Sequence, residues 1–178
     1  MEDFKKLFDS FSKLKIGVIG DVMLDTYMWG KVDRISPEAP VPVVSLNNKE
    51  YRIGGAGNVA LNCKSLGAEV FILSVAGNDT EGELLDELFT THDIHTNYLL
   101  RSTERITTSK TRIISRNQQM MRLDAEVTND LAGKDENNLL AEVKEFIAAQ
   151  KPDIIIFEDY NKGVLTEKII QEVISLCR

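Results

Sequence analysis

Cysteine is scarce in this sequence, which contains Cys63 and Cys177 among its 178 residues. The two cysteines lie far apart and form no C-x-x-C pair. This argues against a fold held by disulfides and against a zinc site, and it suits a reducing compartment. Histidine is equally rare, and His92 and His95 fall in the loop-like stretch THDIH. Two histidines alone do not make a ligand set, so we expect surface residues there and no metal site.

Long apolar runs are missing too. No stretch approaches the roughly 20 apolar residues that a membrane-spanning helix needs, and the opening MEDFKKLFDSFSKLK lacks the apolar centre of a signal peptide. Basic residues are outnumbered by acidic ones, 21 to 28, for a net charge of −7. Such a surface repels nucleic acid and anionic membranes, although it permits a local basic pocket. We therefore expect a cytoplasmic protein with no nucleic-acid or membrane partner.

Apolar patterning predicts an α/β fold. Hydrophobic residues make up 43% of the chain, which allows one domain with a sizeable core. Apolar strands alternate with amphipathic helices, as in a parallel sheet with flanking helices and right-handed crossovers. The predicted strands are residues 15–22, 68–75 and 153–160. Three helices are predicted at residues 4–14, 57–66 and 135–150. A fourth begins at a capping box formed by Thr80 and Glu83, and a fifth is capped by Thr166.

Two segments, residues 27–53 and 98–124, interrupt this alternation. The first is rich in proline and valine and has no helical period, and the second has the pattern of strands with a hairpin turning near Asn117. We expect both to form one small antiparallel sheet outside the core, as a β lid. The α/β core then consists of residues 1–26, 54–97 and 125–178.

The predicted core sheet is thin. A doubly wound domain normally continues beyond three strands, and in so narrow a sheet some apolar helix faces lack a partner. We therefore expect an incomplete α/β core whose C-terminal part belongs to a longer protein.

Polar residues follow the first predicted strand at Asp21 and Asp25. Ligands of open α/β sheets bind at the carboxyl ends of strands, where a carboxylate can accept hydrogen bonds from two neighbouring sugar hydroxyls. Asn58 can both donate and accept, which also suits hydroxyls. The pattern favours a binding role for Asp25, whereas for Asp21 a role in capping the turn is equally compatible.

The glycines of GGAGNVALN allow three interpretations. Gly55, Gly57 and Ala60 match the G-x-G-x-x-A spacing of a dinucleotide-binding turn, which would indicate NAD. That turn needs a strand directly before it in a βαβ unit, but the first core strand ends about thirty residues earlier. A glycine pair at Gly54 and Gly55 that lets the backbone approach a polyol explains the residues better. A plain strand-to-helix turn is the third option.

Cations gather on one predicted strand. Because side chains alternate along a strand, one face holds Thr108, Lys110, Arg112, Ile114 and Arg116. Lys110 and Arg112 can bind a phosphate group there, with bidentate contacts from the arginine. The alternative is a solvated strand face.

Five motifs in order, GDVMLD, RISPEAPVPVV, GGAGNVALN, TSKTRIISRNQQMMRLD and DYNKGVLT, resemble the ribokinase-like (PfkB) carbohydrate kinases. Within that family they are most similar to the heptose 7-phosphate kinases of ADP-heptose synthesis, over nearly the whole chain. The resemblance implies an α/β core with a β lid used for homodimerisation, ATP, magnesium and a sugar hydroxyl as acceptor. It implies a sugar-holding carboxylate, a sugar-side turn and two lid cations as substrate-binding residues: Asp25, Gly54, Gly55, Asn58, Lys110 and Arg112.

The family's catalytic motifs have no assigned counterpart here. The G-A-G-D motif, which carries the base and the anion hole, is not in the sequence, and no stretch is assigned to the N-x-x-E motif for magnesium and phosphate. Glu158 also replaces the serine more usual before Asp159. The resemblance implies phosphorylation of the anomeric hydroxyl of D-glycero-D-manno-heptose 7-phosphate, for the lipopolysaccharide core, by the parent protein, with this chain alone inactive. An NAD-binding oxidoreductase domain and a non-catalytic sugar-binding or dimerisation module stay open as alternatives.

Overall fold

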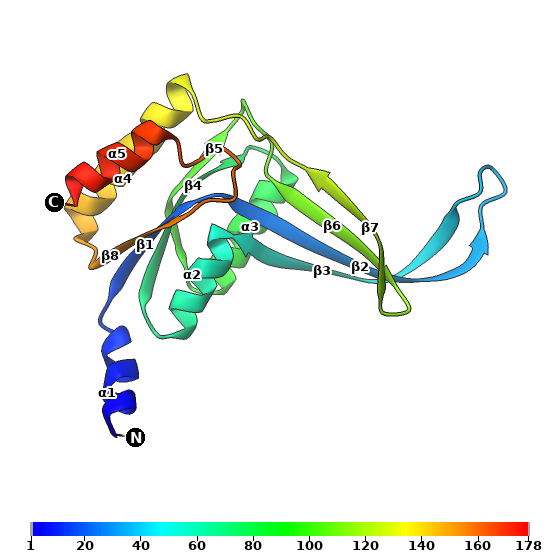
Figure 1. Cartoon of the computed structure of the whole chain (residues 1–178), viewed down its shortest axis with the longest axis horizontal. Coiled ribbons are helices and arrows are strands. Elements are labelled where there is room, and N and C mark those ends of the chain that lie inside the picture. The colour runs from blue at the N-terminus through cyan, green and yellow to red at the C-terminus, as the bar shows by residue number, and fades with distance from the viewer. Residues whose placement is uncertain (1, 178) are drawn as a thin grey trace.

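A parallel sheet of four strands lies at the centre of the molecule (Figure 1). The computed structural model describes residues 2–177. The sheet has the order β5-β4-β1-β8, and every neighbouring pair is parallel. Its strands are β1 (Lys15–Gly20), β4 (Glu69–Gly77), β5 (His95–Ser102) and β8 (Ile154–Glu158). The predicted α/β fold with a parallel sheet is confirmed.

Helices cover both faces of this sheet (Figure 1). Side chains of α2 (Ala56–Ser65) and α3 (Thr80–Thr91) form one apolar core with one face of β1 and β4. Side chains of α4 (Gly133–Gln150) and α5 (Glu167–Leu176) form a second core with the other face. Two buried faces explain why β1 and β4 are nearly continuous apolar runs. The remaining helix, α1 (Glu2–Phe11), extends away from the sheet (Figure 1).

Helix ends follow the expected chemistry with one exception. Thr166 caps α5 as predicted, since its hydroxyl accepts the N–H of Ile169 at 3.2 Å. The predicted cap of α3 at Thr80 is wrong, because Asp79 is the N-cap and accepts the N–H of Gly82 at 2.9 Å. A carboxylate directly before the helix caps it as well as a hydroxyl does. Within residues 2–177 no helix combines the length and apolarity needed to cross a membrane.

A second sheet of four strands leaves the carboxyl end of the parallel sheet (Figure 1). Its order is β3-β2-β6-β7. Its strands are β2 (Val22–Ile35), β3 (Pro42–Gly55), β6 (Ser109–Ser115) and β7 (Gln118–Ala125). The long β2–β3 ribbon continues beyond β6 and projects from the molecule (Figure 1). The β2–β3 ribbon, residues 22–55, therefore extends beyond the predicted segment 27–53 at both ends.

Two expectations about this sheet are wrong. Residues 98–102 lie in β5 of the parallel sheet and not in the second sheet. β5 is an edge strand whose residues are mostly half-buried, so it lacks the continuous apolar run of the central strands. The sheet is also mixed, since β2 and β6 are parallel while β2–β3 and β6–β7 are antiparallel. The parallel strands of the core all end at the same edge of their sheet. Because β2 and β6 both begin at this edge, both run outward from it and are parallel to each other.

The β6–β7 hairpin turns where predicted. Arg116 and Asn117 have φ angles of 50° and 62°, the pair of positive values that a two-residue type I′ turn requires. Arg116 is therefore a turn residue and not, as its spacing indicated, a member of the cationic strand face. The sequence signal for the turn was the asparagine, which tolerates this conformation better than most residues.

Candidate functional site

A cavity of about 420 Å³ lies where the second sheet meets the parallel sheet. All six residues that the sequence nominated line it: Asp25, Gly54, Gly55, Asn58, Lys110 and Arg112. They come from β2, β3, α2 and β6, which are separated by up to 87 positions in the chain. The fold thus brings the nominated residues together, and their role in binding stays a prediction.

Asp25 and Arg112 form an ion pair at one wall of this cavity. Arg112 Nη1 donates to Asp25 Oδ1 at 2.5 Å, and both side chains are about four-fifths buried, with exposures of 21% and 18%. Burial opposes the charged guanidinium, but the hydrogen bond to Asp25 and the negative charge of nearby groups, Asp25 first among them, together outweigh it and raise the pKa of Arg112. The Tyr27 ring lies 5.2 Å from the guanidinium and supports it from one side. The carboxylate is therefore already oriented before a ligand arrives.

Glycines let the β3–α2 turn pass close to Asp25. A Cβ on Gly54 would lie 2.5 Å from Asp25 Oδ2, and Gly55 has a φ of +59° that disfavours other residues. Gly57 serves a different purpose, since a Cβ there would collide with Ile53 and Phe89. The glycine therefore lets α2 pack closely. The strand before this turn belongs to the second sheet, so the βαβ context of a dinucleotide site is absent among residues 2–177.

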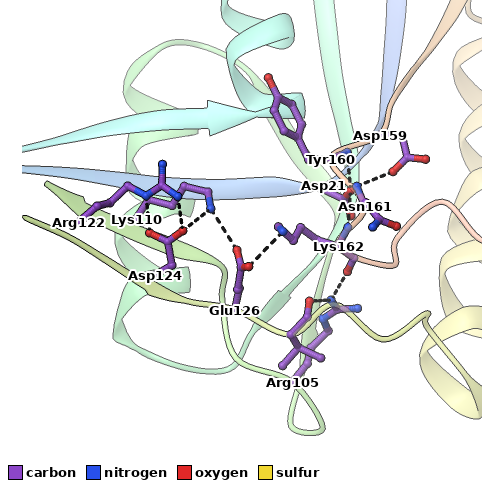
Figure 2. A network of polar contacts seen from close by, with 11 residues as sticks. Asp21, Arg105, Lys110, Arg122, Asp124, Glu126, Asp159, Tyr160, Asn161 and Lys162 are labelled. Carbon is purple, nitrogen blue, oxygen red and sulfur yellow. Dashed lines mark hydrogen bonds and ion pairs between the residues drawn. The ribbon is translucent and has the colours of Figure 1, made fainter.

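Lys110 belongs to a chain of ion pairs (Figure 2). Its ammonium contacts Asp124 at 3.0 Å and Glu126 at 3.1 Å, and Arg122 contacts Asp124 at 2.8 Å. The second oxygen of Glu126 accepts from Lys162, also at 3.1 Å. The hydrogen bond from Lys110 lowers the pKa of Glu126, so this carboxylate is ionised at neutral pH. The network connects the second sheet to the loop after β8.

Asp21 is buried and holds that loop. Its carboxylate is 0% exposed and accepts three backbone N–H groups, those of Tyr160 at 2.8 Å, Lys162 at 3.1 Å and Val164 at 3.0 Å. Of the two roles that the sequence left open for Asp21, the structure therefore places it in the structural one. Its position one residue after β1 contains no signal for a partner 139 to 143 residues away.

Other cavity residues were not found from the sequence. They are Met23, Tyr27, Arg52, Ile53, Arg122 and Tyr160. Alternation could have indicated Tyr27, which shares the face of Asp25 two residues earlier. Arg52 and Arg122 require the strand register, because they lie opposite Asp25 and Arg112 on neighbouring strands. Nothing local indicates Tyr160.

The lining of the cavity is cationic although the chain is acidic. It carries one carboxylate, Asp25, and four cations, Arg52, Lys110, Arg112 and Arg122. Each of these cations is also paired with a carboxylate, that of Asp25, Glu50, Asp124 or Glu126. The site therefore offers an anionic ligand the remaining N–H donors of these cations, while the Asp25 carboxylate and the amide of Asn58 suit hydroxyls. Among the residues that the structure describes, no three His, Cys, Asp or Glu side chains are grouped so that they could hold a metal ion.

A parallel sheet covered by helices on both faces, a second sheet at its carboxyl edge and a cavity where the two sheets meet define an α/β protein of the open-sheet class. Residues 13–178 match the family described as pfkB family carbohydrate kinase, and the chain belongs to this family. The "Bifunctional protein HldE" of Helicobacter acinonychis is 47% identical over 91% of this chain. That of Trichlorobacter lovleyi is 42% identical over 96%. The chain spans 35% and 34% of their lengths.

Solved structures share the fold. A carbohydrate kinase from Agrobacterium tumefaciens has a TM-score of 0.66 at 22% identity, covering 93% of this chain and 50% of that one. Phosphofructokinase-2 from Escherichia coli in complex with fructose-6-phosphate has a TM-score of 0.65 at 15% identity, covering 91% and 50%. The likeness therefore extends across both sheets of this chain.

Proposed function

We propose that this chain is the sugar-binding part of an ATP-dependent kinase that phosphorylates the anomeric hydroxyl of D-glycero-D-manno-heptose 7-phosphate. The observation that carries the proposal is the cavity, which combines a fixed carboxylate and an amide with four cations. The sugar is both polyhydroxylated and anionic, so it needs both kinds of partner. Support also comes from the bifunctional HldE relatives at 42–47% identity and from the motifs that resemble heptose 7-phosphate kinases.

Each group has a stated task in this proposal. Asp25 accepts hydrogen bonds from neighbouring sugar hydroxyls, Asn58 donates and accepts, and the glycine pair lets the backbone approach the ring. Lys110 and Arg112 attract the phosphate group of the sugar. In the reaction the anomeric hydroxyl loses its proton and gains a phosphoryl group, with ADP as the second product.

ATP and magnesium complete the proposed reaction. The described residues contain no cluster suited to a metal ion, so the groups present do not fit magnesium by themselves. We assign no residue of this chain to either cofactor, and we place their binding groups and the general base in the part of the kinase outside it. A cytoplasmic location remains an expectation from composition.

The second sheet is the proposed surface for a homodimer. By strand register, Met28, Ile113 and Met121 form a row on the face opposite Lys110, and Leu123 lies on the same face. Met121 is 53% and Leu123 is 52% exposed. An exposed apolar face on a sheet is a ready site for a second copy.

A substrate comparison on the full-length protein tests the proposed function. We expect it to phosphorylate heptose 7-phosphate and to use the unphosphorylated heptose at least roughly a hundredfold less efficiently in kcat/KM, because charged contacts are worth about 1.5–3 kcal/mol each. Equal use of the two sugars would contradict the phosphate-binding role of the cations. No phosphorylation of either would contradict the heptose assignment.

A further inference from the structure

Residues 159–164, in the loop between β8 and α5, are wrapped around a single buried carboxylate. Asp21 accepts three N–H groups of this loop with its two oxygens. This course of the loop requires two residues in the left-handed region, Asn161 at a φ of 56° and Gly163 at 83°. Non-glycine residues keep such angles only where their surroundings hold them.

Further contacts hold the same loop from outside. The carbonyl of Lys162 accepts from Arg105 at 2.5 Å, and the carbonyl of Gly163 accepts the N–H of Leu131 at 2.8 Å. A Cβ on Gly163 would lie 2.1 Å from the carbonyl oxygen of Asn129. The loop backbone is thus fixed on both sides.

The side chain of Tyr160 is left to face the cavity. Its N–H is held by Asp21, while the side chain lines the cavity together with Asp25 and Asn58. The residue is 48% exposed, and its ring points away from Lys162 and Arg105 (Figure 2). A tyrosine ring offers an apolar face to the C–H side of a sugar and a hydroxyl at its edge.

We propose that Tyr160 contacts the sugar directly and that Asp21 is the positioning residue that places it. The proposal rests on the proposed function of the cavity. Three N–H donors need both carboxylate oxygens, and an amide at position 21 would offer one oxygen and turn an NH₂ group toward backbone donors. Losing the charge at Asp21 should therefore shift the loop and, with it, the ring of Tyr160.

Kinetics of the full-length protein test this assignment. We expect Tyr160→Ala to raise the KM for the sugar roughly tenfold, equivalent to one lost contact, with the KM for ATP unchanged and kcat altered less than the sugar KM. Asp21→Asn should raise the sugar KM similarly. Because Asp21 acts through Tyr160, the double variant should be no worse than the single ones. The matched control is Asp153→Asn, since Asp153 accepts the N–H of Lys15 at the opposite end of the sheet and should leave the sugar KM unchanged.

Several results would overturn the proposal. An unchanged sugar KM in Tyr160→Ala would contradict the proposed contact between Tyr160 and the sugar. Additive effects of the two substitutions in the double variant would contradict the positioning role of Asp21. If Asp21→Asn does not fold, Gly163→Ala takes its place in the comparison of single and double variants. This substitution displaces the same loop and leaves Asp21 unchanged. All measurements use whichever phosphorylated sugar the wild-type protein accepts. The assignment of heptose as the substrate and the proposed contact between Tyr160 and the sugar can therefore fail independently of each other.

Discussion

Asp25 and Arg112 form an ion pair with each other, and this pairing decides what the substitution of either residue does. Each satisfies the other across two parallel strands, so removing either leaves a charge that is about four-fifths buried without its counterpart. Lys110 differs, because two carboxylates share its charge and keep it in place. The two cations therefore differ in what their loss does to the site.

At this scale, Asp25→Ala in the full-length kinase should lower the sugar kcat/KM roughly ten- to a hundredfold, since a charged acceptor of hydroxyl hydrogen bonds is worth about 1.5–3 kcal/mol. The KM for ATP should stay unchanged. Steady-state kinetics with each substrate varied in turn measure both effects. Unchanged sugar kinetics would make Asp25 a turn residue and move the site elsewhere.

Lys110→Met and Arg112→Met should separate the two cations. We expect Lys110→Met to penalise the phosphorylated sugar selectively, because Asp25 keeps its own partner. Arg112→Met should impair both the phosphorylated and the unphosphorylated sugar, because it also releases Asp25. The ratio of the two kcat/KM values in each variant is the measurement. Equal losses on both sugars in Lys110→Met would show that this lysine does not bind phosphate.

Among the elements, α3 and the segment before β6 are joined by one side chain. Asp79 caps α3 through Gly82 and also accepts the N–H and the hydroxyl of Thr107 at 2.7 and 2.6 Å. Burial raises the pKa of this carboxyl, but the hydrogen bonds from Thr107 and Gly82 outweigh burial and lower it. A single carboxylate thus fixes where the second sheet leaves the core.

That contact should be sensitive to acid. Because the pKa of Asp79 is lower in the folded than in the unfolded chain, unfolding takes up protons near pH 4. The stabilisation is complete above that pH and is lost as pH falls further. Asp79→Asn should therefore cost on the order of 1 kcal/mol at pH 7 and progressively less below pH 4. Urea unfolding across this range, with the exposed Asp33→Asn as control, measures the difference. A pH-independent cost would contradict the explanation.

The exposed face of the second sheet carries the dimer prediction. Met121→Glu places a charge in the row of apolar side chains and should shift the full-length protein toward monomer. Gln119→Glu adds the same charge to the other face of the sheet, since Gln119 lies opposite Ile114, and should leave assembly unchanged. Light scattering coupled to size exclusion gives the masses. A wild-type monomer, or a Met121→Glu dimer, would rule this face out as the interface.

For the whole molecule, the proposed function divides between this chain and the rest of the kinase. In that proposal the cavity of this chain holds the sugar, whereas no general base is assigned within residues 1–178. We expect residues 1–178 alone to show no turnover in a coupled ATP assay, while the full-length protein is active, because alignment and activation of the hydroxyl need groups outside the chain. Robust turnover by residues 1–178 would contradict this.

Local patterns in the sequence determined three of the four strands of the parallel sheet and half of the residues that line the cavity. Continuous apolar runs marked β1, β4 and β8. Both faces of β1 and β4 are buried, whereas β8 is an edge strand of partly exposed residues. The asparagine at position 117 marked the hairpin, and the motifs marked Asp25 and the glycine turn. Residues close together in the sequence are enough to predict these features, because an apolar run, a tight turn and a motif each consist of neighbouring residues.

Tertiary structure alone decided the rest. The sequence pattern places β5 in the second sheet, because its residues are mostly half-buried and form no continuous apolar run. The parallel pairing of β2 with β6 follows from where the core strands end. The partners of Asp21, Lys110 and Tyr160 lie on strands and loops distant in sequence. Which charges meet depends on strand register and on the course of the loop after β8, and no local pattern encodes either.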